Sequence, residues 1–196
     1  QSDEDILLDY ERMLNTYHDP SPFSMLRIGL APVNPVTATE SLLKETIRYA
    51  RKHNLVCHTH LAEAEQENQW SLDLHGMREF DYMESIEWVG PDVWFAHCLH
   101  LTDDEIKRMG EYRCGVAHCP VSNAKLGSIA NIFPMLEQGV KIGFGVDGMG
   151  GFGDMVAELQ TALILHSYSS QSQKKSPIGS PELARTVLRI ASKEVQ

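Results

Sequence analysis

The sequence has no surplus of positive charge: its 17 Lys and Arg residues face 27 Asp and Glu, giving a formal net charge of −10. Nucleic acids and anionic membrane surfaces are bound by clustered Lys and Arg, so neither is expected as the main partner. No apolar run approaches the roughly 20 residues that a transmembrane helix needs. A content of 42% hydrophobic and 22% charged residues instead indicates a globular protein.

Cysteine pairs at disulfide or metal-binding spacing are also absent. The four cysteines form no C-x-x-C, and three of them lie in or beside apolar runs, where buried free thiols are common. This favours a reducing, cytoplasmic setting. The start of the chain has neither the basic segment nor the apolar run of a signal peptide. It also lacks an initiator Met, which predicts that the chain begins partway through a longer protein.

Several enzyme signatures are missing, and each absence excludes a class. The chain has no H-E-x-x-H of zinc proteases, no P-C-x-x-C of the zinc deaminases that act on nucleic-acid bases, and no G-x-S-x-G. A phosphate-binding G-x-x-x-x-G-K-[ST] is absent as well. The glycine-rich segment 148–154 is a poor dinucleotide fingerprint, because its third glycine is misplaced and no acidic residue follows at the needed distance.

The chain does contain a regular alternation of helix and strand patterns. The helical patterns cover 5–17, 39–53, 64–74, 81–88, 102–109, 132–138, 155–168 and 181–191. The strand patterns are short apolar runs at 26–31, 55–61, 92–97, 115–118 and 140–146. The polar stretch 169–176 is expected to be a surface loop. Strands that alternate with helices imply parallel β/α units, in an open doubly wound sheet or in part of a closed eight-stranded barrel.

Residues able to bind metal or carry protons stand at the ends of four successive apolar strands. They are His58, His60 and Glu63 in V-C-H-T-H-L-A-E, His97 in W-F-A-H-C, His118 in G-V-A-H-C-P, and Asp147 in I-G-F-G-V-D-G. A buried strand is a costly place for such groups unless each has a partner. In barrel enzymes the carboxyl ends of the strands are where catalytic groups converge. Four such ends in succession predict a shared site.

His60, Glu63 and Asp147 carry the strongest indication of chemistry. Glu63 follows His60 by three residues, so together they supply a neutral imidazole ligand and a carboxylate that could hold a metal-bound water. His58 and His60 alone would be satisfied core histidines. Asp147 ends a glycine-flanked apolar strand, and metal ligation is a good reason for a carboxylate there.

The remaining polar residues keep more than one interpretation. His97 is a candidate general acid or base, metal ligand or core histidine, and His118 is less clear still. Ser122 and Asn123, expected in a loop, fit ordinary turn chemistry as well as contacts to substrate or to the metal shell. Four further histidines are expected on the surface, namely His53, His75, His100 and His166.

In these motifs the chain resembles the amidohydrolase superfamily, specifically its branch of cytosine/guanine-type deaminases and triazine hydrolases. H-T-H-L-A-E, the following A-H, V-A-H-C-P-x-S-N-x-x-L-G-S and G-V-D-G come in the family's order. T-Y-H-D-P-S-P and G-P-D-V-W-F-A-H-C-L-H-L resemble its 8-oxoguanine deaminase group and the hydroxytriazine relatives of that group. The resemblance covers nearly the whole chain.

The resemblance implies a fold and an extent. The fold would be a partial (β/α)8 TIM-type barrel of the α/β class, roughly strands four to eight with their helices. The family's first strand carries another H-x-H, which supplies two metal ligands, and nothing in this sequence corresponds to it. Residues 1–196 are therefore expected to be the C-terminal portion of the barrel, with the upstream strands and a small β domain lying outside the chain.

The resemblance also implies roles for individual residues around one divalent metal ion, usually zinc and sometimes iron. The implied roles are metal ligation by His60, ligation and proton acceptance by Asp147, proton transfer by Glu63, substrate polarisation by His97, and substrate binding by His97, Ser122 and Asn123. His58 matches a family position and is interpreted as lying behind the ligands.

The expected reaction is metal-dependent hydrolytic deamination of an aminated nitrogen heterocycle, such as an 8-oxoguanine-like purine or a pterin. One alternative is a triazine-type hydrolysis that releases chloride or an alkylamine. Another is a catalytically silent fragment that needs the N-terminal part, because five strands of an eight-stranded barrel leave two open edges. The expected partner is a small heterocyclic substrate, and a homo-oligomer remains open.

Overall fold

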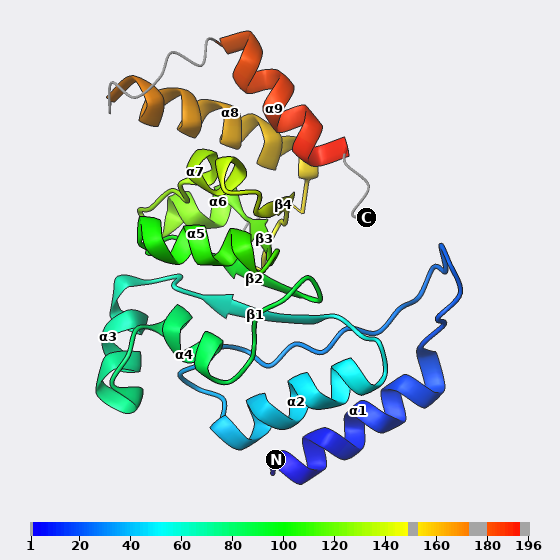
Figure 1. Cartoon of the computed structure of the whole chain (residues 1–196). Coiled ribbons are helices and arrows are strands. Elements are labelled where there is room, and N and C mark those ends of the chain that lie inside the picture. Colours follow the sequence, from blue (N-terminus) through cyan, green and yellow to red (C-terminus); the bar gives the residue numbers. More distant parts are fainter. Residues whose placement is uncertain (1, 149–152, 173–179, 193–196) are drawn as a thin grey trace.

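The structure is a computed structural model that describes residues 2–148, 153–172 and 180–192. Within these ranges the chain forms nine helices and four strands (Figure 1). The helices are α1 (Asp3–Tyr17), α2 (Glu40–Lys52), α3 (Glu65–His75), α4 (Glu79–Ser85), α5 (Asp103–Glu111), α6 (Pro120–Lys125), α7 (Ile132–Glu137), α8 (Met155–Ser172) and α9 (Ser180–Ser192). The strands are β1 (Cys57–Leu61), β2 (Val93–His97), β3 (Gly115–His118) and β4 (Lys141–Phe144).

The strands form one parallel sheet in chain order, β1-β2-β3-β4. Each of the first three strands is followed by helical structure that returns the chain to the start of the next strand, as the alternating sequence pattern predicts. In the register Leu61 lies opposite His97, and His118 lies opposite Phe144. The carboxyl ends of all four strands therefore meet at one edge, where the candidate residues are found.

The predicted strand at 26–31 is largely wrong, because only one residue of it pairs with the sheet. Leu30 forms an isolated parallel bridge with Cys57, donating to the Val56 carbonyl at 3.0 Å and accepting from the His58 N–H at 2.9 Å. Pro32 follows at once and has no N–H to continue a ladder. Leu26 is 52% exposed, so the start of the run has no core to bury against.

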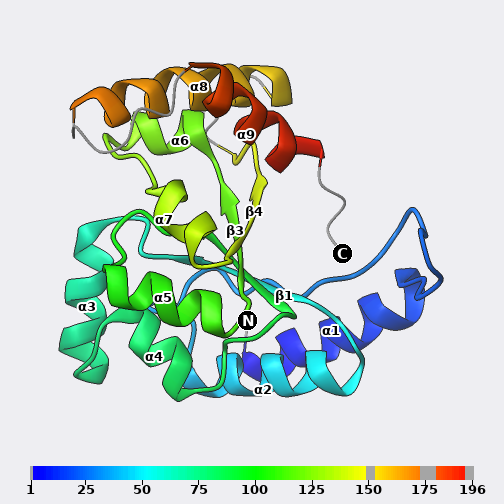
Figure 2. The ribbon, with the colours of Figure 1, turned by 45° about the horizontal axis from the view of Figure 1, so that its top comes forward.

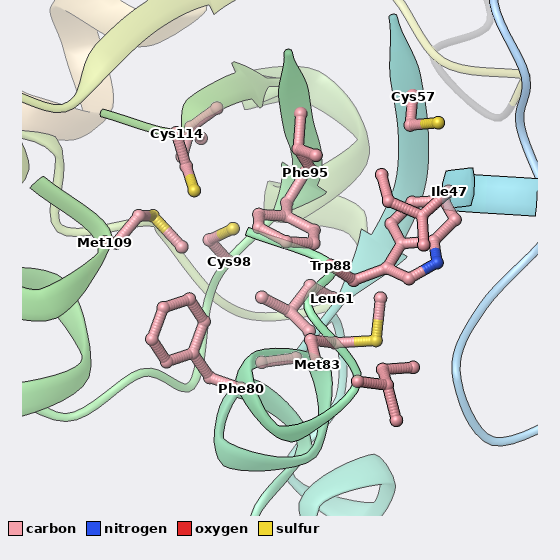
Figure 3. Packing of buried hydrophobic residues seen from close by; sticks show 14 of the residues in the cluster. Ile47, Cys57, Leu61, Phe80, Met83, Trp88, Phe95, Cys98, Met109 and Cys114 are labelled. Atoms are coloured by element: carbon pink, nitrogen blue, oxygen red, sulfur yellow. The ribbon is translucent and has the colours of Figure 1, made fainter. Parts of the chain in front are cut away.

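The main core lies between the sheet and α2, α4 and α5, and its largest side chains are fully buried (Figure 3). Trp88 is 0% exposed and donates its indole N–H to the Leu43 carbonyl at 2.6 Å. Phe80 meets Phe95 of β2 in an edge-to-face contact, with centroids 6.4 Å apart. Burying aromatic side chains of this size is the dominant favourable term in such a core, and it holds β1 and β2 rigidly in place.

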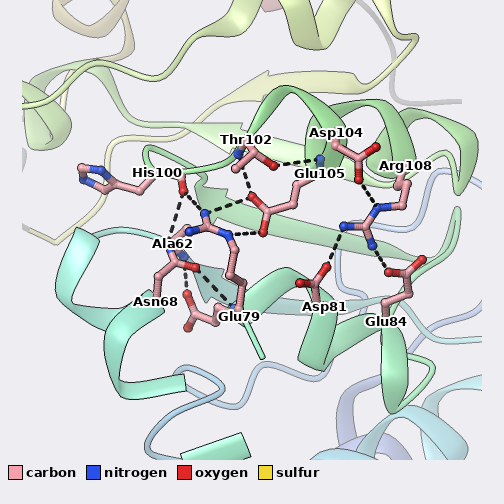
Figure 4. A network of polar contacts seen from close by, with 11 residues as sticks. Ala62, Asn68, Glu79, Asp81, Glu84, His100, Thr102, Asp104, Glu105 and Arg108 are labelled. Atoms are coloured by element: carbon pink, nitrogen blue, oxygen red, sulfur yellow. Dashed lines mark hydrogen bonds and ion pairs between the residues drawn. The ribbon is translucent and has the colours of Figure 1, made fainter. Parts of the chain in front are cut away.

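A polar network fixes the segment after β2 against α4 and α5 (Figure 4). The Arg78 guanidinium donates to both carboxylate oxygens of buried Glu105, at 2.7 and 3.0 Å, and to the His100 carbonyl at 2.7 Å. Glu105 also accepts the Thr102 N–H in a capping box that begins α5. Bidentate Arg–carboxylate contacts specify geometry as well as energy, so the network holds the turn that follows His97.

The carboxyl-terminal helices pack over the far end of the sheet. α8 and α9 lie side by side beyond β4, and α6 lies between β3 and α8 (Figures 1 and 2). Leu183, Val187 and Ala162 form their buried contact, with Phe133 and Phe144 packed against it. None of the helices in the described ranges has both the length and the apolar character that crossing a lipid bilayer requires.

Most predicted helices and strands lie close to their observed positions. Seven of the eight predicted helices begin and end within three residues of the predicted ranges, and four of the five predicted strands do so within two. The helix α6 was not predicted. The exception among the predicted helices is α8, which continues to Ser172 and so enters the segment 169–176 that was expected to be a surface loop. Residues 173–176 of that segment lie outside the described ranges. Residues 149–152 of the glycine-rich segment lie outside them as well.

Candidate active site at the carboxyl ends of the strands

His60 projects from β1 with a single defined tautomer. Its Nδ1 lies 2.6 Å from the Val33 carbonyl oxygen. Because a carbonyl oxygen can only accept, this nitrogen carries a proton and donates it, and Nε2 is the ring nitrogen left to bind a metal. A neutral imidazole whose second nitrogen is tied to a backbone carbonyl is the usual arrangement of a metal-ligating histidine.

Glu63 stands in a turn that the side chains of two other glutamates hold in place. Glu67 accepts the Glu63 N–H at 2.8 Å and the Ala64 N–H at 3.2 Å, and Glu79 accepts the Ala62 N–H at 2.6 Å. Ala62 has φ of 48°, a left-handed conformation that a non-glycine residue adopts only where its surroundings enforce it. The turn therefore places the Glu63 side chain, 28% exposed, over the end of the sheet.

The carboxyl group of Glu79 is buried behind this turn, and its environment alters its protonation. Burial has the largest effect on the Glu79 pKa. Together with the charges of Glu67 and Glu105 it outweighs the Ala62 N–H and the charge of Arg78 and raises this pKa from 4.5 to about 8. The Oε1 atom has no hydrogen-bond partner among the described residues. Glu79 is therefore protonated at neutral pH in the folded protein.

Replacing Glu79 by Gln is expected to flatten the pH dependence of stability. The folded state keeps a proton that the unfolded state loses above pH 4.5, so this contribution is fully present below pH 4.5 and is lost as pH rises through about 8. Between pH 5 and pH 8 the natural protein should lose on the order of a few kcal/mol more unfolding free energy than Glu79→Gln, as read from urea titrations. Exposed Glu137→Gln is the control and should behave like the natural protein. Equal pH slopes for Glu79→Gln and the natural protein would contradict the assignment.

His97 is almost completely buried, at 1% exposure, and it lies against two carboxylates. Its Nε2 is 3.4 Å from Glu63 Oε1 and 3.8 Å from Asp147 Oδ2. The ring stacks on His60 with centroids 5.3 Å apart. His97 has φ of 69°, so this strand also ends in a left-handed residue. The His97 imidazole therefore has the His60 ring against one face and the carboxylates of Glu63 and Asp147 near its Nε2.

Asp147 completes the group from the end of the fourth strand. Ser122 donates its hydroxyl to Asp147 Oδ2 at 2.6 Å. Burial raises the pKa of Asp147, but the hydrogen bonds from Ser122 and from the Gly148 N–H, together with His97 and His60, outweigh burial and leave the pKa below its ordinary value. The carboxylate is therefore ionised at neutral pH.

The predicted residues come together at one site. The ligand atoms of His60, Glu63 and His97 all lie within 4.8 Å of one another, the spacing of a group that can hold a metal ion. Asp147 borders this cluster through its contact with His97. Imidazole nitrogens and carboxylate oxygens are the donors that zinc accepts, so the side chains fit a divalent cation.

Ser122 and Asn123 lie on a helix, and the prediction that they occupy a loop is wrong. Both fall in α6, where Pro120 occupies a first-turn position that suits proline. Ser122 is 1% and Asn123 0% exposed, and their polar atoms contact Asp147 and His97 respectively. They hold other site residues in place, and direct substrate contact by either stays a prediction.

Sequence reasoning missed His166 and left the role of His118 unclear. His166 on α8 was expected on the surface, but it is 3% exposed and its Nε2 lies 3.1 Å from Nε2 of His118. The signal that could have shown its burial is the apolar run T-A-L-I-L before it. The other three histidines expected on the surface are all partly buried.

A parallel sheet with helices between its strands, and with histidines and carboxylates gathered at the carboxyl ends, is the arrangement of a (β/α)-barrel enzyme. Residues 2–191 match the model of the Amidohydrolase family. The chain belongs to this family.

Similar proteins agree with this assignment. The chain is 36% identical over 182 residues to the 8-oxoguanine deaminase of Pseudomonas aeruginosa, covering 90% of this chain and 40% of that protein. It is also 36% identical to the hydroxydechloroatrazine ethylaminohydrolase of Pseudomonas sp. strain ADP, over 92% of this chain and 38% of that protein. The crystal structure of an atrazine chlorohydrolase from Arthrobacter aurescens TC1, complexed with zinc, superposes with a TM-score of 0.85 at 25% identity, over 97% of this chain and 42% of that one.

The comparisons confirm the predicted fold class, because 97% of this chain superposes on part of the barrel of a solved relative. The comparisons also show how much of each relative this chain covers. The chain spans about two fifths of the length of these relatives. The activity of the whole protein is therefore a proposal, built on the part of the site that these residues supply.

Proposed function

We propose that the protein containing this chain catalyses hydrolytic deamination of an aminated nitrogen heterocycle with the help of a divalent metal ion. The observation that carries this proposal is the convergence of His60, Glu63 and His97, whose ligand atoms lie within 4.8 Å, with ionised Asp147 beside them. Three strand ends contribute to this one group. Such a combination of imidazoles and carboxylates serves metal-assisted hydrolysis.

His60 and Asp147 are the residues proposed to hold the metal. His60 presents Nε2, because its Nδ1 is held by the Val33 carbonyl, and Asp147 presents a carboxylate kept ionised by Ser122 and the Gly148 N–H. Zinc is the first candidate because its donors in proteins are of this kind and because the atrazine chlorohydrolase structure contains zinc. Iron is the second. When bound, such an ion lowers the pKa of a coordinated water to about 7 and makes hydroxide available near neutral pH.

Glu63 is proposed to move the protons of the reaction. Its carboxylate is partly exposed, so it can accept a proton from the attacking water and deliver it first to the ring nitrogen and then to the leaving amino group. Water and the amine are consumed, and the ring carbonyl and ammonia are formed. Asp147 is proposed as a second proton acceptor, and His97 as the residue that polarises the substrate from the buried side.

The substrate class is proposed from the relatives. Identity of 36% to an 8-oxoguanine deaminase supports a purine-like ring or another aminated heterocycle such as a pterin, and Ser122 and Asn123 are proposed to border its pocket. All four cysteines are free and buried, which supports a reducing, cytoplasmic location. A homo-oligomer is compatible with these residues.

A second reaction of the same apparatus is favoured by a specific observation. Two of the similar proteins are a hydroxydechloroatrazine ethylaminohydrolase and an atrazine chlorohydrolase. In this alternative the ring carbon loses an alkylamine or chloride in place of ammonia, while Glu63 handles the protons in the same way.

A substrate panel distinguishes the two reactions. The protein at its full natural length, loaded with zinc, is incubated with 8-oxoguanine, isoxanthopterin, hydroxylated N-ethyl triazines and chlorotriazines, and the release of ammonia, ethylamine and chloride is followed separately. Ammonia release from a purine or pterin at rates well above those for the triazines is the expected result. Release of ethylamine or chloride alone would establish the alternative, and no release from any ring would contradict both.

A further inference from the structure

We infer that Asn123, His118 and His166 form a hydrogen-bonded relay behind His97 that holds a proton on its Nδ1 and leaves Nε2 as the ring nitrogen that faces the site. The chemistry of Nε2 rests on the proposed function. The relay itself stands on the contacts of the four side chains, and three of them are positioning residues rather than catalytic ones.

The four side chains are linked end to end. His97 Nδ1 lies 2.9 Å from Asn123 Oδ1, Asn123 Nδ2 lies 3.3 Å from His118 Nδ1, and His118 Nε2 lies 3.1 Å from His166 Nε2. All four are between 0% and 3% exposed. Water therefore cannot replace any of these bonds at little cost, and each atom depends on its neighbour in the chain.

The asparagine gives the relay a direction. One end of its amide can only accept and the other can only donate. Oδ1 faces His97, so His97 Nδ1 must donate; Nδ2 faces His118, so His118 Nδ1 must accept. The His118 proton is then on Nε2 and is donated to His166 Nε2. Turning the amide over would reverse every bond and move the His97 proton to the side of the carboxylates.

The charge state of the two outer histidines agrees with this scheme. Burial, followed by the neighbouring imidazoles of His166 and His97, lowers the pKa of His118 to about 3, and burial lowers the pKa of His166 to about 4. Both rings are neutral at physiological pH, so each has one N–H and one lone pair. A neutral ring donates from one nitrogen and accepts at the other, so the hydrogen bonds all run in the same direction. A charged ring would donate from both nitrogens and interrupt the relay.

The relay ties the site to α8, which lies beyond α6 (Figure 2). Besides His166, α8 supplies buried Glu158, which accepts the Val121 N–H of α6 at 3.0 Å. The Glu158 contact holds α6, and with it Asn123, against α8, and the His166 contact holds α8 against His118 at the end of β3. A helix far along the sequence thus sets the proton position of a histidine at the end of a central strand.

The consequence for the proposed reaction concerns which ring nitrogen of His97 meets the substrate. Because Asn123 holds Nδ1, Nε2 is the nitrogen left to face Glu63 Oε1 at 3.4 Å and Asp147 Oδ2 at 3.8 Å. In deamination His97 would therefore polarise the substrate through Nε2. A ring free to turn over would offer either nitrogen and position neither.

The test reads the tautomer directly by ¹⁵N NMR of the zinc-loaded protein at its full natural length, with its histidines ¹⁵N-labelled. The expected result is a proton on His97 Nδ1, and the same spectrum should show His118 protonated on Nε2 and unprotonated on Nδ1. A His97 Nδ1 without a proton would overturn the inference, and this measurement does not depend on the folding of any variant.

A pair of variants at the distant end tests whether the relay acts on His97. His166→Leu removes the last acceptor, and we expect mixed His97 tautomers with turnover about 10–100-fold lower, the range for partners that orient a site from behind. His166→Gln restores an amide acceptor and should restore the single tautomer and most of the turnover. His75→Leu, a helical histidine that stacks on Tyr82 outside the relay, is the matched control.

The outcomes separate the relay from the proposed function. A folded His166→Leu protein with an unchanged His97 tautomer would contradict the relay, whatever the enzyme does. If the natural protein shows the expected tautomer but deaminates no heterocycle, the relay stands and the proposed function fails.

Discussion

Glu63→Gln is expected to lower turnover by about 10²–10⁴-fold, the range that general acid–base catalysis contributes, while the metal stays bound. Gln has nearly the shape of Glu but cannot accept and return a proton. The turn that carries residue 63 is held by its backbone N–H on Glu67 and by the Ala62 N–H on Glu79, and neither bond involves the Glu63 side chain. The site should therefore keep its geometry and lose only the proton transfer.

The measurement combines steady-state turnover of a substrate that the panel identifies with metal content by elemental analysis. Glu65→Gln, two residues on and exposed at the start of α3, is the matched control and should match the natural protein in both. Loss of metal from Glu63→Gln would show that Glu63 is a ligand rather than a proton carrier. That outcome is the alternative to test, because the ligand atoms of Glu63, His60 and His97 lie within 4.8 Å of one another.

The convergence of the site could be predicted from sequence because of how parallel sheets are built. His60, His97 and Asp147 each follow an apolar run, and the carboxyl ends of parallel strands meet at one edge. The alternation of helix and strand patterns, and the position of each polar residue after its strand, were enough for that prediction. The left-handed conformations of Ala62, His97 and Asp147 were not predictable, because alanine does not favour this conformation and histidine and aspartate adopt it at only a minority of their positions. The surrounding hydrogen bonds impose them, and only the folded chain supplies those bonds.

The wrong predictions concern residues whose conformation or burial is decided by tertiary contacts. The segment S-N-A after Pro120 fits a turn as well as a short helix, and its burial under α8 settles the matter. His166 was assigned to the surface because a histidine on a helix usually lies there, yet α8 turns that face onto His118. Likewise Leu26 has strand propensity, but with no neighbour to cover it the run pairs only at Leu30. The extent of the parent protein stays a prediction.

The two histidines of β1 look equivalent in sequence and differ in structure. Both point to the same side of the strand, and both donate Nδ1–H to a carbonyl, His60 to Val33 at 2.6 Å and His58 to Trp94 at 3.3 Å. The His58 ring stacks on Trp94 with centroids 5.2 Å apart. His60 instead stacks on His97 and lies within reach of Glu63. Only His60 is therefore placed to bind a metal together with the acidic groups.

Replacing these two histidines in parallel is therefore expected to give opposite results for metal binding. His60→Gln should lower zinc affinity by more than the about 10–100-fold typical of residues behind the ligands, and activity should disappear with the metal. His58→Gln should keep the metal, because the stacking partner it loses is Trp94, outside the cluster. Zinc retained on dialysis against a graded chelator series measures both, in the protein at its full natural length. If His58→Gln loses zinc as readily as His60→Gln, the ligand assignment on β1 is wrong, since the two residues would then act as one unit.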